Sequence, residues 1–178
     1  MSRYYILLIM FFSLVFSYEN KFNYNSSHEN KISFTHTPDF IELDGGYTRI
    51  SKFGEGHTTE VGFPELPQFT TYYQIDPQKE YDFQFKVIES YVLEDITVLP
   101  HQGMDKWEIE TVGLINNDVY NSYESYPIKN LNVSDRSQGR GIEFVSISVI
   151  PYMYFPAKKR LEVFTRIEID IIEIGVNN

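Results

Sequence analysis

The clearest pattern in the chain is strict alternation of apolar and polar residues, which is typical of a β-strand with one buried face. Residues 81–87 place an aromatic or aliphatic side chain at every second position. Residues 161–174 alternate in the same way over a longer stretch. Both segments are predicted to be strands. The period slips at Val87-Ile88, which indicates a β-bulge there.

Turn residues separate several further apolar segments. Asp44-Gly45-Gly46 predicts a hairpin between residues 40–43 and 47–51, because glycine tolerates positive φ. Additional strands are expected at residues 68–74, 91–99 and 142–150, and residues 151–160 are expected to form a turn. Three tyrosines spaced by three, at 120, 123 and 126, allow one short helical turn that Pro127 would end.

These segments give about eight strands and little or no helix. Short strands separated by turn signals are typical of an antiparallel β-sandwich. The sequence therefore predicts an all-β sandwich domain over residues 31–178.

The N-terminus has the pattern of a secretory signal peptide. Arg3 precedes an apolar run over residues 4–16, and Ser17 fits a cleavage site. The run is shorter than the roughly 20 residues of a membrane-spanning helix. Residues 1–17 are thus predicted to be a signal peptide that sends the chain to the periplasm or outside the cell, an uncleaved anchor being the alternative. Residues 18–30 are polar and are expected to form a flexible leader.

Composition narrows the possible functions. The chain contains no cysteine, which excludes a thiol nucleophile, a disulfide and a thiolate metal site. Its net charge is −10, and removing residues 1–17 takes away only Arg3 and gives −11. Such an acidic chain is not expected to bind nucleic acid or, after signal cleavage, an anionic membrane.

The sequence offers no clear catalytic or metal-binding motif. Histidines occur at positions 28, 36, 57 and 101, and none has the HxH or HExxH spacing of a metal site. No metal or cofactor is therefore predicted. The scattered carboxylates leave open a glycosidase pair, since such pairs meet in space rather than in sequence.

Two strings carry a resemblance to a known family. One is Gly62-Phe-Pro-Glu-Leu-Pro67; the other is Arg140-Gly141, then an apolar strand, then Pro151-Tyr-Met-Tyr-Phe-Pro156. In order and approximate spacing, residues 47–173 resemble the propeptide of gingipain-type cysteine peptidases. The positions that match its structural motif are Gly62, Pro64, Leu66, Pro67, Arg140, Gly141, Pro151 and Pro156.

The resemblance implies an antiparallel β-sandwich and a non-catalytic role. Such propeptides assist the folding of the cysteine peptidase catalytic domain and keep the zymogen latent, and a basic side chain on a loop enters the peptidase's specificity pocket. No catalytic domain follows Asn178 in this sequence. The chain is therefore expected to be a stand-alone prodomain or a truncated precursor, and not an enzyme.

Three basic residues are candidates for the inhibitory side chain. Arg136 is the first, because it lies in a polar, turn-rich segment where a side chain can protrude. A guanidinium can pair bidentately with a buried acid in a partner pocket. Arg140 and Lys129 are the other candidates. The alternatives are that Arg136 is an ordinary solvated arginine and that Arg140 holds its loop structurally.

Two other functions remain open from the sequence. The domain could bind carbohydrate or another ligand, in which case Trp107 and several tyrosines should form an exposed row. It could instead be a structural piece of an extracellular assembly, with residues 161–174 left as an apolar edge for another chain.

Overall fold

The computed structural model describes residues 23–28, 30–50, 56–103 and 112–176. The predicted signal peptide and Trp107 lie outside these residues. Twelve strands fall within them, with a single α-helical turn, α1 (Asn117–Tyr120), and a 3₁₀ turn, η1 (Pro156–Lys158). The predicted all-β fold is confirmed, although short strands raise the count above eight. None of the helices in these residues is long or apolar enough to cross a bilayer.

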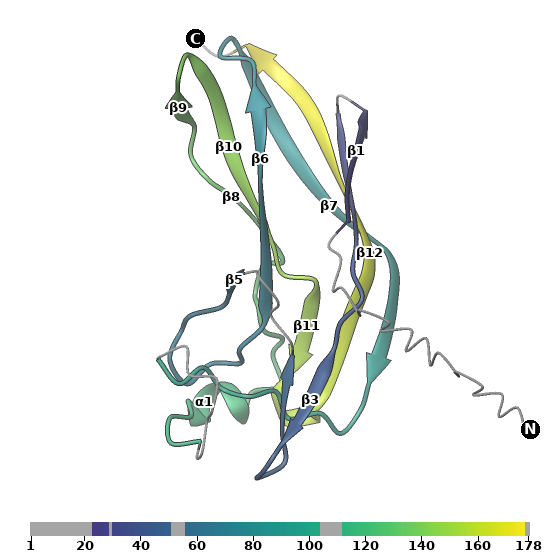
Figure 1. The fold of residues 1–178 in the computed structure, drawn as a ribbon, viewed down its shortest axis with the longest axis vertical. Coiled ribbons are helices and arrows are strands. Elements are labelled where there is room, and N and C mark those ends of the chain that lie inside the picture. The colour runs from purple at the N-terminus through teal and green to yellow at the C-terminus, as the bar shows by residue number, and fades with distance from the viewer. Residues whose placement is uncertain (1–22, 29, 51–55, 104–111, 177–178) are drawn as a thin grey trace, which may run out of the picture.

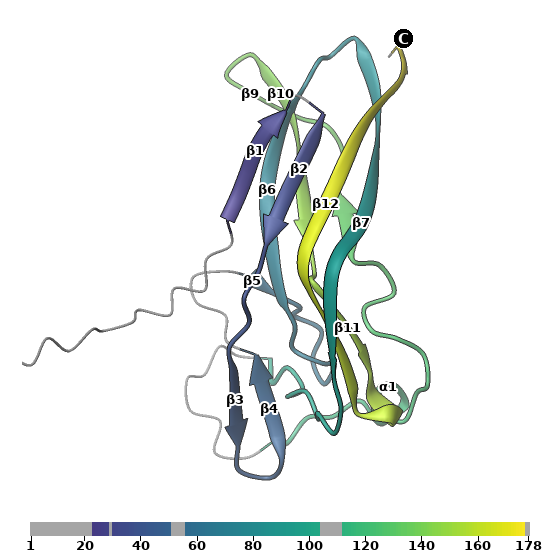
Figure 2. The same ribbon diagram turned by 90° about the vertical axis from the view of Figure 1, so that its right-hand side faces the viewer.

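The strands form two five-stranded antiparallel sheets and a hairpin, arranged as an elongated two-layer molecule (Figures 1 and 2). The first sheet contains β1 (Asn23–His28), β2 (Lys31–Thr35), β7 (Lys79–Leu93), β11 (Tyr152–Phe155) and β12 (Arg160–Val176). The second contains β5 (Gly56–His57), β6 (Pro67–Ile75), β8 (Leu131–Val133), β9 (Ser137–Gly139) and β10 (Ile142–Val149). The hairpin is β3 (Phe40–Leu43) with β4 (Tyr47–Ile50), as predicted.

Strand β12 is the central strand of the first sheet. It pairs with β7 along one side and with β2 and β11 along the other. The predicted alternation is confirmed, except that a register shift buries Phe164 and leaves Thr165 half-buried. The predicted bulge is confirmed too, because the pairing passes from Glu89 to Val87 and leaves out Ile88. Since β12 is paired with β7 along its length and with β11 and β2 on its other side as far as Asp170, residues 161–174 are not the free edge that the assembly hypothesis required.

Several boundaries differ from the predictions. The expected strand at 91–99 is the end of β7 followed by isolated bridges at Val98 and Pro100. The expected turn at 151–160 contains strand β11, whose Tyr152 and Tyr154 are fully buried, and only η1 turns the chain. Residues 23–28, expected to be flexible, form β1. Polar sequence does not prevent this, because a strand joins a sheet through its backbone.

Two hydrophobic clusters hold the layers together. The first joins Ile32 and Phe34 of β2 and three isoleucines of β12 to Ile75, Val145, Ile147 and Val149 of the second sheet. The other lies towards the β3–β4 end and includes Leu66, Val98, Tyr152 and Tyr154. Strand β12 contributes to both clusters, through Ile167, Ile169 and Ile171 to the first and through Leu161 and Val163 to the other.

Candidate functional site

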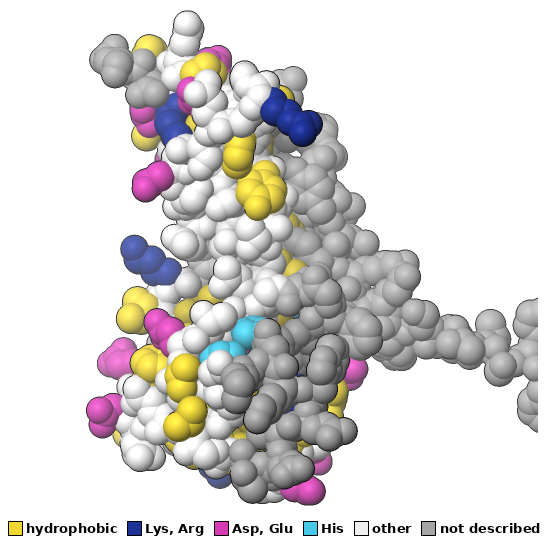
Figure 3. All heavy atoms as spheres, turned by 60° about the vertical axis from the view of Figure 1, so that its left-hand side comes forward, with side chains coloured by type: hydrophobic (Ala, Val, Ile, Leu, Met, Phe, Trp, Pro, Cys, Tyr) yellow, Lys and Arg dark blue, Asp and Glu magenta, His cyan; other side chains and the backbone are white. Residues whose placement is uncertain are grey.

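Acidic residues outnumber basic ones in this chain, so the surroundings of each basic candidate matter. The chain has 25 acidic and 15 basic residues. On the face shown in Figure 3, the Lys and Arg side chains stand apart from one another, with acidic side chains among them. The position of each basic candidate decides whether it can reach an acid on a partner.

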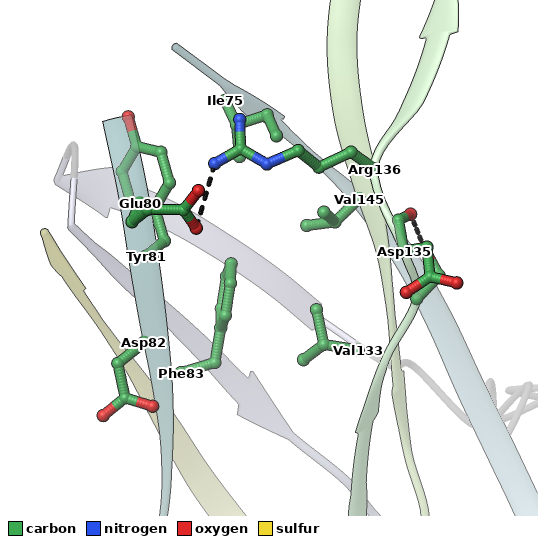
Figure 4. A pocket seen from close by; sticks show the side chains of 10 residues that line it. Ile75, Glu80, Tyr81, Asp82, Phe83, Val133, Asp135, Arg136 and Val145 are labelled. Carbon is green, nitrogen blue, oxygen red and sulfur yellow. Dashed lines mark hydrogen bonds and ion pairs between the residues drawn. The ribbon is translucent and has the colours of Figure 1, made fainter. Parts of the chain in front are cut away.

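Arg136 is bound into the domain itself. It lies between β8 and β9, and its guanidinium donates hydrogen bonds to the carbonyl oxygens of Lys79 and, at 3.5 Å, Pro77. It also forms ion pairs with Glu80 at 3.3 Å and Glu143 at 3.6 Å. Figure 4 shows the side chain extending across to Glu80. Arg136 thus ties the β8–β9 segment to the β6–β7 turn.

The guanidinium of Arg136 lies over an opening between the two sheets. Its walls are Ile75, Tyr81, Phe83, Val133 and Val145, which come from both sheets (Figure 4). Charged groups surround these apolar side chains, so the arginine closes one end of the sandwich core against water. This arrangement is the one expected of a structural arginine.

Arg140 occupies the tip of the β9–β10 hairpin. Gly139 pairs with Ile142, so Arg140 and Gly141 form a two-residue turn. Their φ angles are 52° and 79°, as the tight hairpin turns with two left-handed residues require. Both residues are exposed. Arginine is not favoured in this conformation, which costs a non-glycine residue about 1–2 kcal/mol.

Lys129 projects from a different loop. It is exposed, and its neighbour Ile128 is 92% exposed. Asn130 anchors the loop, because its Nδ2 donates to the carbonyl oxygens of Ile150, at 2.8 Å, and Tyr152, at 2.7 Å. Lys129 therefore lies next to one end of β10 and Arg140 next to the other.

The length of β10 separates the two exposed candidates. Its eight residues span roughly 26 Å at the usual rise of a strand. One narrow pocket on a partner cannot receive both side chains at once. Arg140 and Arg136 lie close along the chain, but only Arg140 is at the tip.

The motif positions around Gly62 have structural roles. Gly62 has a φ of 80°, its N–H donates to the carbonyl of His101 at 2.8 Å, and its own carbonyl accepts from Asn116 N–H at 3.0 Å. A Cβ on Gly62 would lie 2.9 Å from the Asn116 nitrogen, too close for any side chain. Leu66 is fully buried, and Pro64 bridges to Pro100.

The remaining motif positions are also buried. Three prolines are shielded from solvent. Pro67 begins β6, Pro151 lies between β10 and β11, and Pro156 begins η1.

One group of residues was not anticipated from the sequence. His57, Glu65 and His101 come together near the β3–β4 end, and one ligand atom from each lies within 4.8 Å of the others. They are 8 and 36 residues apart in sequence and belong to three different segments. No spacing rule finds such a set, because the segments meet only through long-range pairing, of Pro64 with Pro100 and of His57 with Pro67.

The tyrosines at 120 and 126 do not form an exposed row. Tyr120 donates a 2.7 Å hydrogen bond to the Val98 carbonyl, and burial raises its pKa. Tyr126 bridges to Tyr154, and burial raises its pKa too. Tyr123 is 72% exposed. Two of the three tyrosines therefore cover the core.

Comparison with known proteins identifies a family and similar folds. A family model described as Propeptide_C25 matches residues 28–174. A search of curated protein sequences found no match.

Two solved structures from Porphyromonas gingivalis are similar in fold. One is a chain of the complex of the RgpB pro- and mature domains, with a TM-score of 0.66, 16% identity, and coverage of 87% of this chain and 86% of that chain. The other comes from a structure on the zymogenic latency of gingipain K, with a TM-score of 0.59, 18% identity, and coverage of 84% and 91%.

Proposed function

This chain belongs to the Propeptide_C25 family, and from that membership we propose that it binds the catalytic domain of a gingipain-type cysteine peptidase, assists its folding and keeps it latent. The observation that carries the proposal is the family match over residues 28–174, which includes almost all of the described domain. In the proposed role the chain supplies a binding surface and performs no chemistry itself.

We place the inhibitory contact at Arg140. The side chain is exposed at the tip of a two-residue turn, and rigid strands on both sides fix its direction. An arginine in the left-handed conformation costs stability, and strained residues of this kind cluster at functional sites. A guanidinium at this tip can pair bidentately with a carboxylate at the base of a specificity pocket.

Arg136 then has a supporting role. Its contacts with the β6–β7 turn hold the end of the sandwich from which the β9–β10 hairpin extends. Lys129 is the remaining alternative for the inhibitory contact, because it too is exposed and stands in an anchored loop.

The proposal is tested by inhibition of a gingipain-type peptidase from the same organism. We expect the purified domain to inhibit at nanomolar concentration, and Arg140→Ala to weaken inhibition by about 2–5 kcal/mol, the range for a buried charge pair that loses one partner. Lys129→Ala tests the alternative contact, since it removes the other exposed basic candidate. Inhibition lost in Lys129→Ala and kept in Arg140→Ala would move the contact to the other end of β10. No inhibition by the wild-type domain would overturn the function.

Export of the chain is a separate proposal. Residues 4–16 are apolar and follow Arg3, and a domain that keeps a peptidase latent acts where that peptidase is made and exported. Mass spectrometry of the secreted or periplasmic protein should find an N-terminus after residue 17. Recovery of the full-length chain in the membrane fraction would indicate an uncleaved anchor instead.

A further inference from the structure

We infer that His57, Glu65 and His101 form a binding site for a divalent metal ion of the zinc type. The site is independent of the proposed contact with a peptidase. One ligand atom from each of the three residues lies within 4.8 Å of the others. Tetrahedral zinc with bonds of about 2.0–2.1 Å places its ligands ~3.3 Å apart, so small side-chain rotations bring the three atoms into range.

The histidine hydrogen bonds favour metal binding. Nδ1 of His57 lies 2.9 Å from the Thr58 carbonyl oxygen. A carbonyl can only accept, so Nδ1 carries the proton and Nε2 of the neutral ring carries the lone pair. Metal-binding histidines commonly use this arrangement, in which a backbone carbonyl fixes the ring through the nitrogen that does not bind the metal.

The second histidine is paired with the carboxylate. Nδ1 of His101 donates to Oε2 of Glu65 at 2.8 Å, and both side chains are more than nine-tenths buried. A metal ion takes the place of the proton that this pair shares. The carboxylate then supplies one negative charge, which offsets half of the charge of the divalent ion.

Backbone hydrogen bonds hold the three segments in place. Glu65 N–H donates to the Leu99 carbonyl, and His101 N–H donates to the Phe63 carbonyl, each at 2.8 Å. The Thr58 hydroxyl donates to the Pro64 carbonyl at 2.8 Å and accepts from Leu66 N–H at 3.0 Å. The segments carrying His57, Glu65 and His101 are thus fixed to one another, as a preorganised metal site requires.

The donor set and its access indicate which ion binds. Two imidazoles and one carboxylate are the ligands of catalytic zinc sites, whereas calcium and magnesium prefer oxygen alone. Three protein ligands leave a fourth position for water or a group from another molecule. His57 is only half-buried, which gives the ion a path to the site.

The test is titration of the purified, metal-free domain with Zn²⁺ by calorimetry and with Co²⁺ by visible absorption. No peptidase is present, so the result does not depend on the proposed function. We expect one ion per chain, bound at about 1 µM or tighter. The Co²⁺ complex should show the intense visible bands of tetrahedral coordination, and saturating Zn²⁺ should raise the Tm by on the order of 5–10 °C.

Variants identify the ligands. His57→Ala should weaken binding by more than about 100-fold, and Glu65→Gln should weaken it as well. His57 is the least buried of the three, so its variant should keep the fold, which circular dichroism in the presence of a chelator checks. His28→Ala is the control, because it removes a histidine from β1 in the other sheet. Absence of binding, octahedral cobalt spectra, or undiminished affinity in His57→Ala would overturn the site.

Discussion

At the scale of single residues, two arginines four positions apart have opposite environments. Arg136 is engaged with backbone carbonyls and two glutamates, and Arg140 extends from a hairpin tip. The sequence placed both in a polar, turn-rich segment and favoured Arg136 for the inhibitory contact. The sequence could not show which arginine is exposed. Arg136 is bound within the domain by the β6–β7 turn, which lies nearly 60 residues earlier in the chain.

The two arginines should respond differently to substitution. Arg136→Ala should lower the free energy of unfolding by about 1–2 kcal/mol, because charged hydrogen bonds to backbone are lost. Arg140→Gly should raise it by about 0.5–1 kcal/mol, because glycine relieves the positive φ. Urea unfolding of the two variants measures both effects. A destabilised Arg140→Gly would mean that Arg140 holds its loop structurally.

His36 should make the fold sensitive to acid. Burial lowers the pKa of His36 from 6.5 to about 4, and its Nε2 lies 2.8 Å from the Tyr152 hydroxyl. Between these pH values the unfolded chain binds a proton that the folded chain does not. The contribution of neutral His36 to the free energy of unfolding is therefore fully present above pH 6.5. It is lost as the pH falls towards 4, and the loss amounts to at most about 3 kcal/mol.

The measurement is the free energy of unfolding at several pH values between 7 and 4. His36→Phe removes the titrating group and keeps a ring in the space beside Phe69 and Tyr152. Its stability should fall less steeply over this range than that of the wild type. Equal slopes would show that His36 does not carry the effect.

At the scale of elements, alternation was the most informative pattern. It correctly predicted β12, the first half of β7 and the bulge between Val87 and Glu89. The turn predicted at residues 151–160 was wrong for β11, because Pro151 and Pro156 lie on either side of a strand. Residues 23–28 carry no apolar pattern, and their strand depends on backbone pairing with β2, which sequence periodicity does not reveal.

Strand β12 offers a direct check of the core. Ile169 is fully buried and belongs to the cluster between the sheets, while Ile174 of the same strand is 64% exposed. Ile169→Ala should destabilise the domain by about 2–5 kcal/mol through the lost burial and the cavity. Ile174→Ala should change stability by about 0.5 kcal/mol or less. Similar unfolding midpoints for the two variants would contradict the assigned core.

Within residues 62–67, Gly62 is the position where adding a side chain should destabilise the fold most directly. Gly62→Ala adds a methyl group 2.9 Å from the Asn116 nitrogen in addition to the cost of a positive φ. Gly141→Ala has the same kind of φ and nothing within 4 Å. Gly141→Ala should therefore cost about 1 kcal/mol, and Gly62→Ala at least about twice as much. Thermal unfolding compares them, and equal losses would show that the Asn116 contact relaxes.

At the scale of the whole molecule, long-range contacts account for what the sequence could not predict. The fold class could be predicted from short alternating strands. The order of the strands within each sheet could not, because β12 pairs with β2 and β7, which lie far from it in the sequence. The group of His57, Glu65 and His101 depends on the same kind of contact. The prodomain role came from motif order rather than from any site geometry.

We propose that this domain binds a gingipain-type peptidase and occupies its specificity pocket. The most direct measurement is surface plasmon resonance of the domain on an immobilised, catalytically inactive peptidase from the same organism, with and without a small inhibitor in the specificity pocket. We expect nanomolar affinity that the pocket inhibitor weakens strongly. Absence of binding at micromolar concentration, or binding that the inhibitor leaves unchanged, would contradict it.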